Sequence, residues 1–158
     1  MSRILIALDV QPGLKTPEII VQTTNKLAKK LPTIATVLLK DKTDTRDNSF
    51  LEWEAPAQDD CRVETNYIYE RHGYQLPPVI LQMLQKNKAE EVLVVGASTE
   101  AFLLAAGFAL FDAGFKVSLI APLCLTGQYH QHTVTLKIWE NSIGQVYETV
   151  SEVGVGVS

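Results

Sequence analysis

The sequence lacks the features that would point to nucleic acid or to a membrane. Its 14 lysines and arginines are outnumbered by 18 aspartates and glutamates, which gives a formal net charge of −4. A nucleic acid or an anionic membrane surface is bound largely through a basic face, so neither partner is expected. No apolar stretch approaches the roughly 20 residues that a membrane-spanning helix needs.

Cysteine and histidine are also scarce. Cys61 and Cys124 form no disulfide or metal-binding pattern, and the amino-terminal apolar run is too short for a signal peptide. We therefore expect reduced thiols in a cytoplasmic protein. Of the three histidines, only His130 and His132 have a spacing that suits a metal, and no third ligand is identifiable. No metal site and no cofactor are predicted.

The composition supplies enough apolar residues for one core. Hydrophobic residues make up 46% of the chain and charged residues 20%, which is typical of a globular protein. A length of 158 residues suits one domain rather than two. We expect a single domain over residues 1–150, followed by a tail at 151–158 that is frayed or contacts a partner.

Apolar runs alternate with helical patterns along the chain. Strands are predicted at residues 3–10, 33–39, 65–69, 92–95, 116–120 and 145–150, and helices at 17–31, 76–88, 99–114 and 128–141. This alternation predicts a three-layer α/β/α domain with a six-stranded, mostly parallel sheet and right-handed connections. Residues 40–62 have no periodicity and are expected to form a long loop.

In such a sheet, ligands bind beyond the carboxyl ends of the strands, where four polar candidates are expected. Asp9 could act as a general base, or could simply bond loop amides. Ser98, with Thr99, opens a helix at a turn that resembles a nucleophile elbow, although capping is the usual role of such a hydroxyl. Arg71 is read by default as a solvated charge in a loop. Cys124 is read by default as a buried, inert thiol.

The segment at 96–117 carries the most specific signal. It reads G-A-S-T-E-A-F-L-L-A-A-G-F-A-L-F-D-A-G-F-K-V. Without a gap, it resembles the pattern G-x-x-T-D-x-C-V-x-x-T-A-x-x-x-x-x-A-G-x-x-V of the isochorismatase-like cysteine hydrolases. This superfamily includes nicotinamidases, isochorismatases and N-carbamoyl amide hydrolases. Similar segments are A-L-D-V-Q-P-G-L at 7–14, N-S-F-L-E-W at 48–53, E-R-H-G-Y at 70–74 and H-T-V-T-L-K-I-W-E-N-S-I-G-Q-V at 132–146.

The resemblance implies a catalytic aspartate, lysine and cysteine, and a cis peptide bond that shapes an oxyanion hole. Asp9 matches the aspartate, Arg71 stands where the lysine is expected, and Phe102 stands in place of the cysteine. The cis bond would fall at Ala97–Ser98. An arginine does not exchange protons near neutral pH, and a phenylalanine offers no nucleophile. The family's thioester mechanism is therefore not expected here.

Three hypotheses follow for the function. The first is a catalytically degenerate family member that is retained for ligand binding or assembly. The second is an active amide, C–N or vinyl-ether hydrolase whose nucleophile has moved to Cys124 or Ser98. The third is an oligomeric interaction module, because family members commonly form oligomers and the helix at 101–111 is unusually apolar. A small-molecule ligand and a homo-oligomer are the expected partners.

Overall fold

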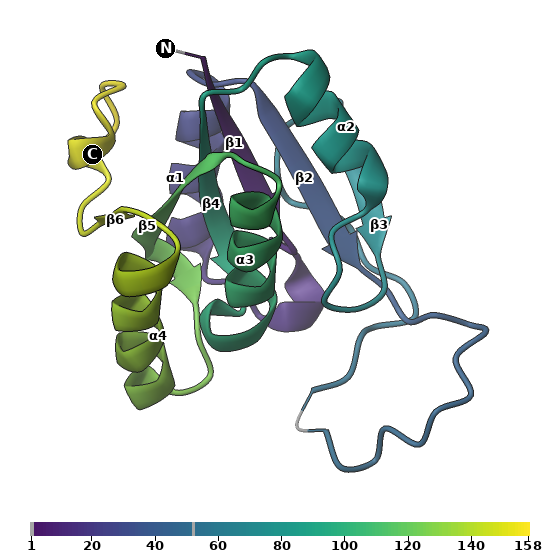
Figure 1. Cartoon of the computed structure of the whole chain (residues 1–158). Helices are drawn as coiled ribbons and strands as arrows, with labels where there is room; N and C mark the ends of the chain where they lie inside the picture. Colours follow the sequence, from purple (N-terminus) through teal and green to yellow (C-terminus); the bar gives the residue numbers. More distant parts are fainter. Residues whose placement is uncertain (1, 52) are drawn as a thin grey trace.

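The computed structural model describes residues 2–51 and 53–158, and its centre is a six-stranded sheet (Figure 1). The strands are β1 (Arg3–Leu8), β2 (Thr33–Leu38), β3 (Ile68–Arg71), β4 (Glu91–Ala97), β5 (Lys116–Leu125) and β6 (Val146–Tyr147). Their order is β3-β2-β1-β4-β5-β6, and each neighbouring pair is parallel. The predicted three-layer fold with a parallel sheet is confirmed. The strand order changes direction between β1 and β4.

Four α-helices cover the sheet. They are α1 (Glu18–Ala28), α2 (Pro78–Lys86), α3 (Leu104–Asp112) and α4 (Tyr129–Ser142). Helices α2, α3 and α4 share one core cluster and α1 belongs to another, so they cover opposite faces (Figure 1). Every helix in the described part of the chain is too short or too polar to cross a bilayer.

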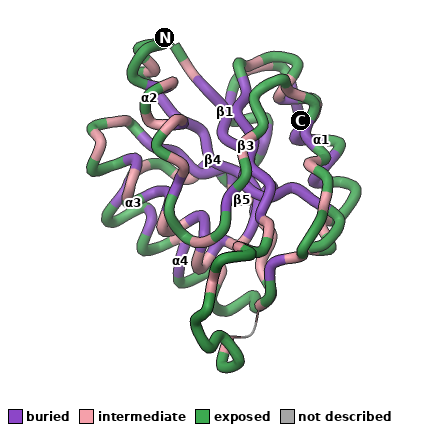
Figure 2. The backbone as a smooth tube through the Cα atoms, turned by 90° about the vertical axis from the view of Figure 1, so that its right-hand side faces the viewer, coloured by how far each residue is buried: buried purple, intermediate pink, exposed green. Residues whose placement is uncertain are grey.

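Both faces of the sheet are apolar because side chains alternate along each strand. On β1, Ile4, Ile6 and Leu8 belong to the cluster with α2, α3 and α4, whereas Leu5 and Ala7 belong to the cluster with α1. Figure 2 shows the buried residues gathered along the strands, with exposed residues on the outer sides of the helices. Burial on both faces explains the continuous apolar runs in the sequence.

The carboxyl-terminal segment differs from the expected frayed tail. Val153 and Val157 are 3% and 7% exposed and belong to the core cluster that includes α1. The Arg3 guanidinium donates a hydrogen bond of 2.8 Å to the Val153 carbonyl, which joins the two ends of the chain. Residues 151–158 therefore complete the layer that α1 begins. They pack there because burying valine side chains on the sheet is favourable.

Strand β3 lies later in the sequence than predicted. The strand begins at Ile68 rather than at residue 65, because Thr65 forms a local turn and its hydroxyl donates to the Thr33 carbonyl at 2.6 Å. Leu38 of β2 pairs with Arg71 of β3. Arg71 is consequently the last residue of a strand and not part of a loop.

Strand β5 is longer than predicted, and β6 is shorter. The register between β4 and β5 passes from Val94–Leu119 to Gly96–Cys124, so a bulge lies in β5 and the strand continues to Leu125. Cys124 therefore lies within β5 rather than after it.

The predicted helix at 99–114 consists of two parts. A π-helical turn, Thr99–Leu103, precedes α3. Just before this turn, Gly96 has a φ of 119°, and a Cβ atom there would lie 1.9 Å from the Leu8 carbonyl oxygen. Only glycine allows β4 to approach β1 so closely at its carboxyl end.

Candidate active site

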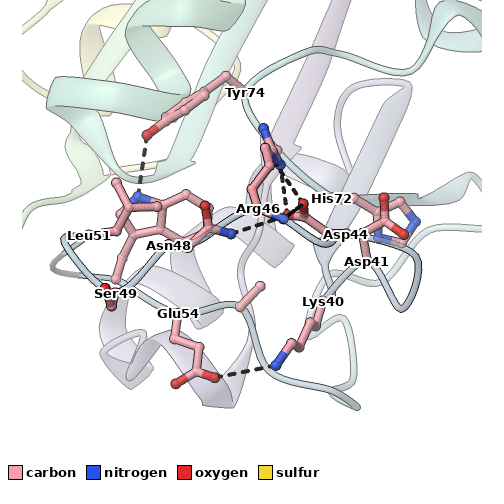
Figure 3. Close-up of a pocket in the computed structure, with 13 residues that line it drawn as sticks. Lys40, Asp41, Asp44, Arg46, Asn48, Ser49, Leu51, Glu54, His72 and Tyr74 are labelled. Carbon is pink, nitrogen blue, oxygen red and sulfur yellow. Dashed lines mark hydrogen bonds and ion pairs between the residues drawn. The ribbon is translucent and has the colours of Figure 1, made fainter.

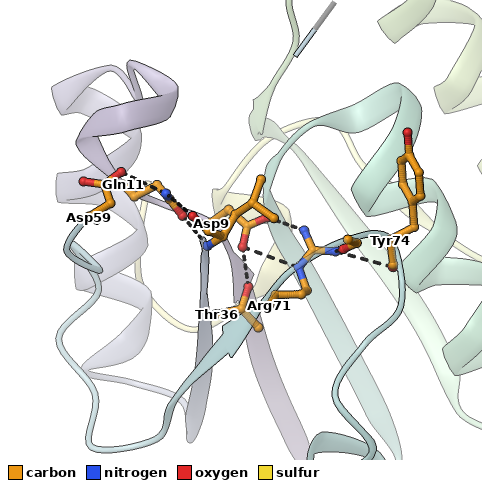
Figure 4. Close-up of polar contacts among 8 residues, drawn as sticks. Asp9, Gln11, Thr36, Asp59, Arg71 and Tyr74 are labelled. Atoms are coloured by element: carbon orange, nitrogen blue, oxygen red, sulfur yellow. Dashed lines mark hydrogen bonds and ion pairs between the residues drawn. The ribbon is translucent and has the colours of Figure 1, made fainter. Parts of the chain in front are cut away.

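The three positions that the resemblance aligns with a catalytic triad come together at the carboxyl ends of the strands. Asp9 follows β1, Arg71 ends β3, and Phe102 lies in the π-helical turn after β4. Asp9 and Arg71 form a fully buried ion pair through Oδ2 and Nη2 (Figure 4). The Arg71 Cζ atom lies 4.7 Å from the centroid of the Phe102 ring.

Asp9 is held by its neighbours on two strands. Its backbone φ is 57°, a left-handed conformation that aspartate tolerates better than most residues. The Thr36 hydroxyl of β2 donates to Oδ1 at 2.7 Å, and Arg71 Nε lies 3.5 Å from the same oxygen. Both carboxylate oxygens are thus engaged, so Asp9 serves a buried polar cluster in addition to any role as a base.

Arg71 is not the solvated charge expected from the sequence. It is 1% exposed, because its position at the end of β3 directs it beneath the segment that follows. Its Nη1 donates to the carbonyls of Gly73 and Tyr74 at 2.9 and 3.4 Å (Figure 4). A buried guanidinium needs both a counterion and hydrogen-bond acceptors, and this site supplies both.

Phe102 is enclosed by aromatic rings. It is 4% exposed, stacks on Tyr74 at 4.9 Å between centroids, and meets Trp53 edge-on at 4.9 Å. The Trp53 indole N–H donates to the Tyr74 hydroxyl at 3.3 Å. Leu38 and Ala55 are buried in the same cluster. We call Phe102, Tyr74 and Trp53 the aromatic plug.

The turn before Phe102 keeps the cis peptide that the resemblance implies. The Ala97–Ser98 bond is cis, whereas its role in an oxyanion site stays a prediction. The expected capping role of Ser98 or Thr99 is wrong, because neither side chain caps the turn. The Thr99 hydroxyl instead donates to the Leu125 carbonyl at 3.3 Å and lies 3.0 Å from His132 Nδ1. Those contacts tie the turn to β5 and α4.

Cys124 lies in the core. Its side chain is buried among α2, α3 and α4 residues, and the thiol donates to the Ile120 carbonyl at 3.2 Å. Burial raises the pKa of the Cys124 thiol far above its ordinary value. Burial also raises the pKa of the half-buried Cys61 thiol. Both cysteines thus remain protonated near neutral pH, in the unreactive form.

An open pocket of about 680 Å³ lies outside the aromatic plug (Figure 3). It is lined by residues of the 40–55 loop and by the segment 72–74, with Trp53 and Tyr74 on its wall. Two ion pairs lie on its lining, Arg46 with Asp44 at 2.8 Å and Lys40 with Glu54 at 3.8 Å. Among the described residues, no cluster of histidine, cysteine and carboxylate side chains could hold a metal ion.

Sequence reasoning did not single out Trp53 or Tyr74. Both fall inside segments that resemble the family, N-S-F-L-E-W and E-R-H-G-Y. The available signal for Tyr74 was its place three residues after Arg71, whereas Trp53 lies far in sequence from Asp9, Arg71 and Phe102. Their contact with Phe102 depends on how the long loop folds back, which no local pattern encodes.

At the level of sequence, no protein-family model and no curated protein matches the chain. Solved structures do match. An isochorismatase-like hydrolase from Alkaliphilus metalliredigens has a TM-score of 0.76 at 13% identity, covering 97% of both chains. A pyrazinamidase/nicotinamidase from Streptococcus mutans has a TM-score of 0.76 at 11% identity, covering 92% of this chain and 99% of that one.

An isochorismatase family protein from Burkholderia thailandensis is also similar. Its TM-score is 0.73 at 20% identity, and the match covers 96% of this chain and 93% of that one. These whole-chain matches confirm that the protein has the isochorismatase-like fold that its sequence resembles.

Proposed function

We propose that this isochorismatase-like protein has lost the family's thiol-dependent hydrolysis and is retained for binding a small molecule or for assembly. The observation that carries the proposal is Phe102, a buried ring where the family has its nucleophile. Covalent catalysis through a thioester needs a thiolate at that place. The ring supplies none, and its aromatic neighbours close the space around it.

The other two triad positions support the same conclusion. Arginine stays protonated near neutral pH, so Arg71 cannot take part in proton transfer as a lysine can. It also pairs with Asp9, whose carboxylate is already bonded to Thr36. A base held in this way has no thiol to activate.

A small-molecule ligand would then bind outside the aromatic plug. The pocket of about 680 Å³ in Figure 3 lies within the usual range of ligand pockets, roughly 300–1,000 Å³. Its wall of Trp53 and Tyr74 offers aromatic surface, and its paired charges offer polar contacts.

The test is incubation of the purified protein with nicotinamide, isochorismate and N-carbamoyl amides, with products followed by NMR. We expect no turnover, while the Streptococcus mutans pyrazinamidase/nicotinamidase serves as a positive control with nicotinamide. Turnover that recurs in independent preparations and disappears in an Asp9→Asn variant would overturn the proposal. Loss in that variant separates the protein's own activity from a contaminant.

A relocated nucleophile is tested by labelling with iodoacetamide in a Cys61→Ser background, which leaves Cys124 as the remaining cysteine. We expect the native protein to label at least about tenfold more slowly than the urea-unfolded chain, because the buried thiol stays protonated. Rapid labelling of the native protein that nicotinamide blocks would instead support Cys124 as a nucleophile.

A further inference from the structure

Arg71 joins two groups of residues that lie on opposite sides of its side chain. Nη2 and Nε face the Asp9 carboxylate, whereas Nη1 faces the carbonyls of Gly73 and Tyr74. The guanidinium also lies 4.7 Å from the Phe102 ring. One side chain therefore contacts the former catalytic acid, the backbone that carries Tyr74, and the substituted nucleophile position.

These contacts use properties that lysine does not have. The guanidinium carries five N–H donors in a fixed plane, so it can bond a carboxylate on one edge and carbonyls on another. An ammonium group concentrates three donors at one point. Lysine at this position could keep the ion pair with Asp9, but it would leave the Gly73 and Tyr74 carbonyls without their donor.

Tyr74 contacts both Arg71 and Phe102. Its carbonyl accepts from Arg71 at 3.4 Å, its ring stacks on Phe102, and its hydroxyl accepts the hydrogen bond from Trp53. Trp53 belongs to the long loop, so the buried ion pair is connected through the aromatic plug to the wall of the outer pocket.

We propose that Arg71 is a positioning residue that acts with Phe102 as one co-adapted unit, holding Tyr74 and Trp53 in place as the wall of the outer pocket. This deepens the proposed function, on which it rests for the role of that pocket. On this proposal, arginine at position 71 and phenylalanine at position 102 depend on each other and together form one structural unit. Changing either residue removes a contact of the other, so their effects should not add.

The test uses the fluorescence of Trp53 and its quenching by acrylamide. Trp139, the second of the two tryptophans, is fully buried in the core and gives a constant background. The variants are Arg71→Lys, Phe102→Leu and the double variant. We expect each single variant to raise the quenching constant about twofold. The quenching constant of the double variant should not exceed that of the more strongly affected single variant.

Two matched controls remove an arginine and a phenylalanine elsewhere. Arg62→Lys changes an exposed ion pair with Glu18, and Phe111→Leu changes a half-exposed ring on α3. Neither should alter the quenching. Unchanged quenching in Arg71→Lys, or effects that multiply to about fourfold in the double variant, would overturn the proposal.

Tyr74→Leu provides a second route if a buried variant fails to fold. Tyr74 is 46% exposed, so its replacement leaves the ion pair of Arg71 and Asp9 in place. We expect this variant, with Arg71 and Phe102 unchanged, to raise the quenching constant of Trp53 about twofold, because Tyr74 no longer covers the indole. Unchanged quenching would overturn the proposal. The quenching experiment does not measure hydrolysis. It can therefore fail while the proposed loss of hydrolysis stands, and it can succeed even if hydrolysis is found.

Discussion

Asp9 combines a left-handed backbone conformation with a buried negative charge. Its φ of 57° suits aspartate or asparagine, and its carboxylate neutralises Arg71. The sequence identified Asp9 as the end of a strand but left its role open between base and structural acceptor. The structure adds the Thr36 hydroxyl and the Arg71 guanidinium, which come from strands β2 and β3. Asp9 therefore has a structural role whether or not it also acts as a base.

Replacing Asp9 with asparagine should be strongly destabilising. Asparagine keeps the backbone conformation and nearly the same shape, so the change chiefly leaves the Arg71 guanidinium buried without a counterion. We expect the free energy of unfolding, measured by urea titration, to fall by about 3 kcal/mol. Glu64→Gln, which removes an exposed partner of Lys29, should cost less than about 1 kcal/mol. Equal losses in the two variants would contradict this account of the buried pair.

The burial of Arg71 could not be predicted from the residues around it in the sequence. An arginine after a strand is solvated in most proteins, and nothing in E-R-H-G-Y indicates burial. Its environment depends on the register between β2 and β3 and on the return of residues 73 and 74 across its side chain. Both are tertiary features.

At the scale of elements, a second polar cluster joins the amino ends of β1, β4 and β5 to the last residue of β6. The Glu91 carboxylate of β4 accepts from the Tyr147 hydroxyl at 3.0 Å and lies 3.4 Å from Lys116 Nζ and 3.8 Å from Arg3 Nε. Arg3 also bonds the Val153 carbonyl. The carboxyl-terminal segment is thus attached to the sheet by polar contacts as well as by its valines.

This cluster predicts a dependence of stability on pH. Burial alone raises the pKa of Glu91, but the nearby Ser118 hydroxyl, the hydrogen bond from Tyr147 and the charges of Lys116 and Arg3 bring it below the ordinary value of 4.5. A carboxyl group with a lowered folded-state pKa stabilises the fold above its unfolded pKa, and this stabilisation is lost as the pH falls through the folded pKa.

We therefore expect the wild-type free energy of unfolding to decrease as the pH falls below about 4.5. A Glu91→Gln variant should show a shallower decrease in the same titration. Glu54→Gln, at a mostly exposed position, should run parallel to the wild type. Identical slopes for the wild type and Glu91→Gln would show that this cluster does not contribute to acid sensitivity.

At the scale of the whole molecule, helices α3 and α4 lie side by side (Figure 1), and both carry exposed apolar side chains. Phe108 and Phe111 of α3 are 41% and 50% exposed, and Val134 and Ile138 of α4 are partly exposed. The apolar helix predicted from the sequence is thus core on one side, where Gly107 meets Trp139, and exposed on the other. Apolar surface of this kind favours association.

The expected homo-oligomer stays a prediction, and this surface is where we propose that the copies meet. Static light scattering should give a mass above the 17.5 kDa of one chain. Phe108→Ser combined with Phe111→Ser should reduce it toward that of the monomer. Ile19→Ser, at an exposed position on α1, should leave it unchanged. A wild-type protein that is monomeric at micromolar concentration would contradict the prediction.

The sequence by itself determined the parallel sheet and the alternation of strands and helices, and its resemblance to the family placed Phe102 at the position of the family's cysteine. These follow from periodic apolar patterns and from a gapless motif, both of which are local properties of the chain. The packing of residues 151–158, the burial of Arg71 and the aromatic plug were decided by tertiary structure. Each depends on contacts between segments far apart in the chain, whose register and distance no local pattern specifies.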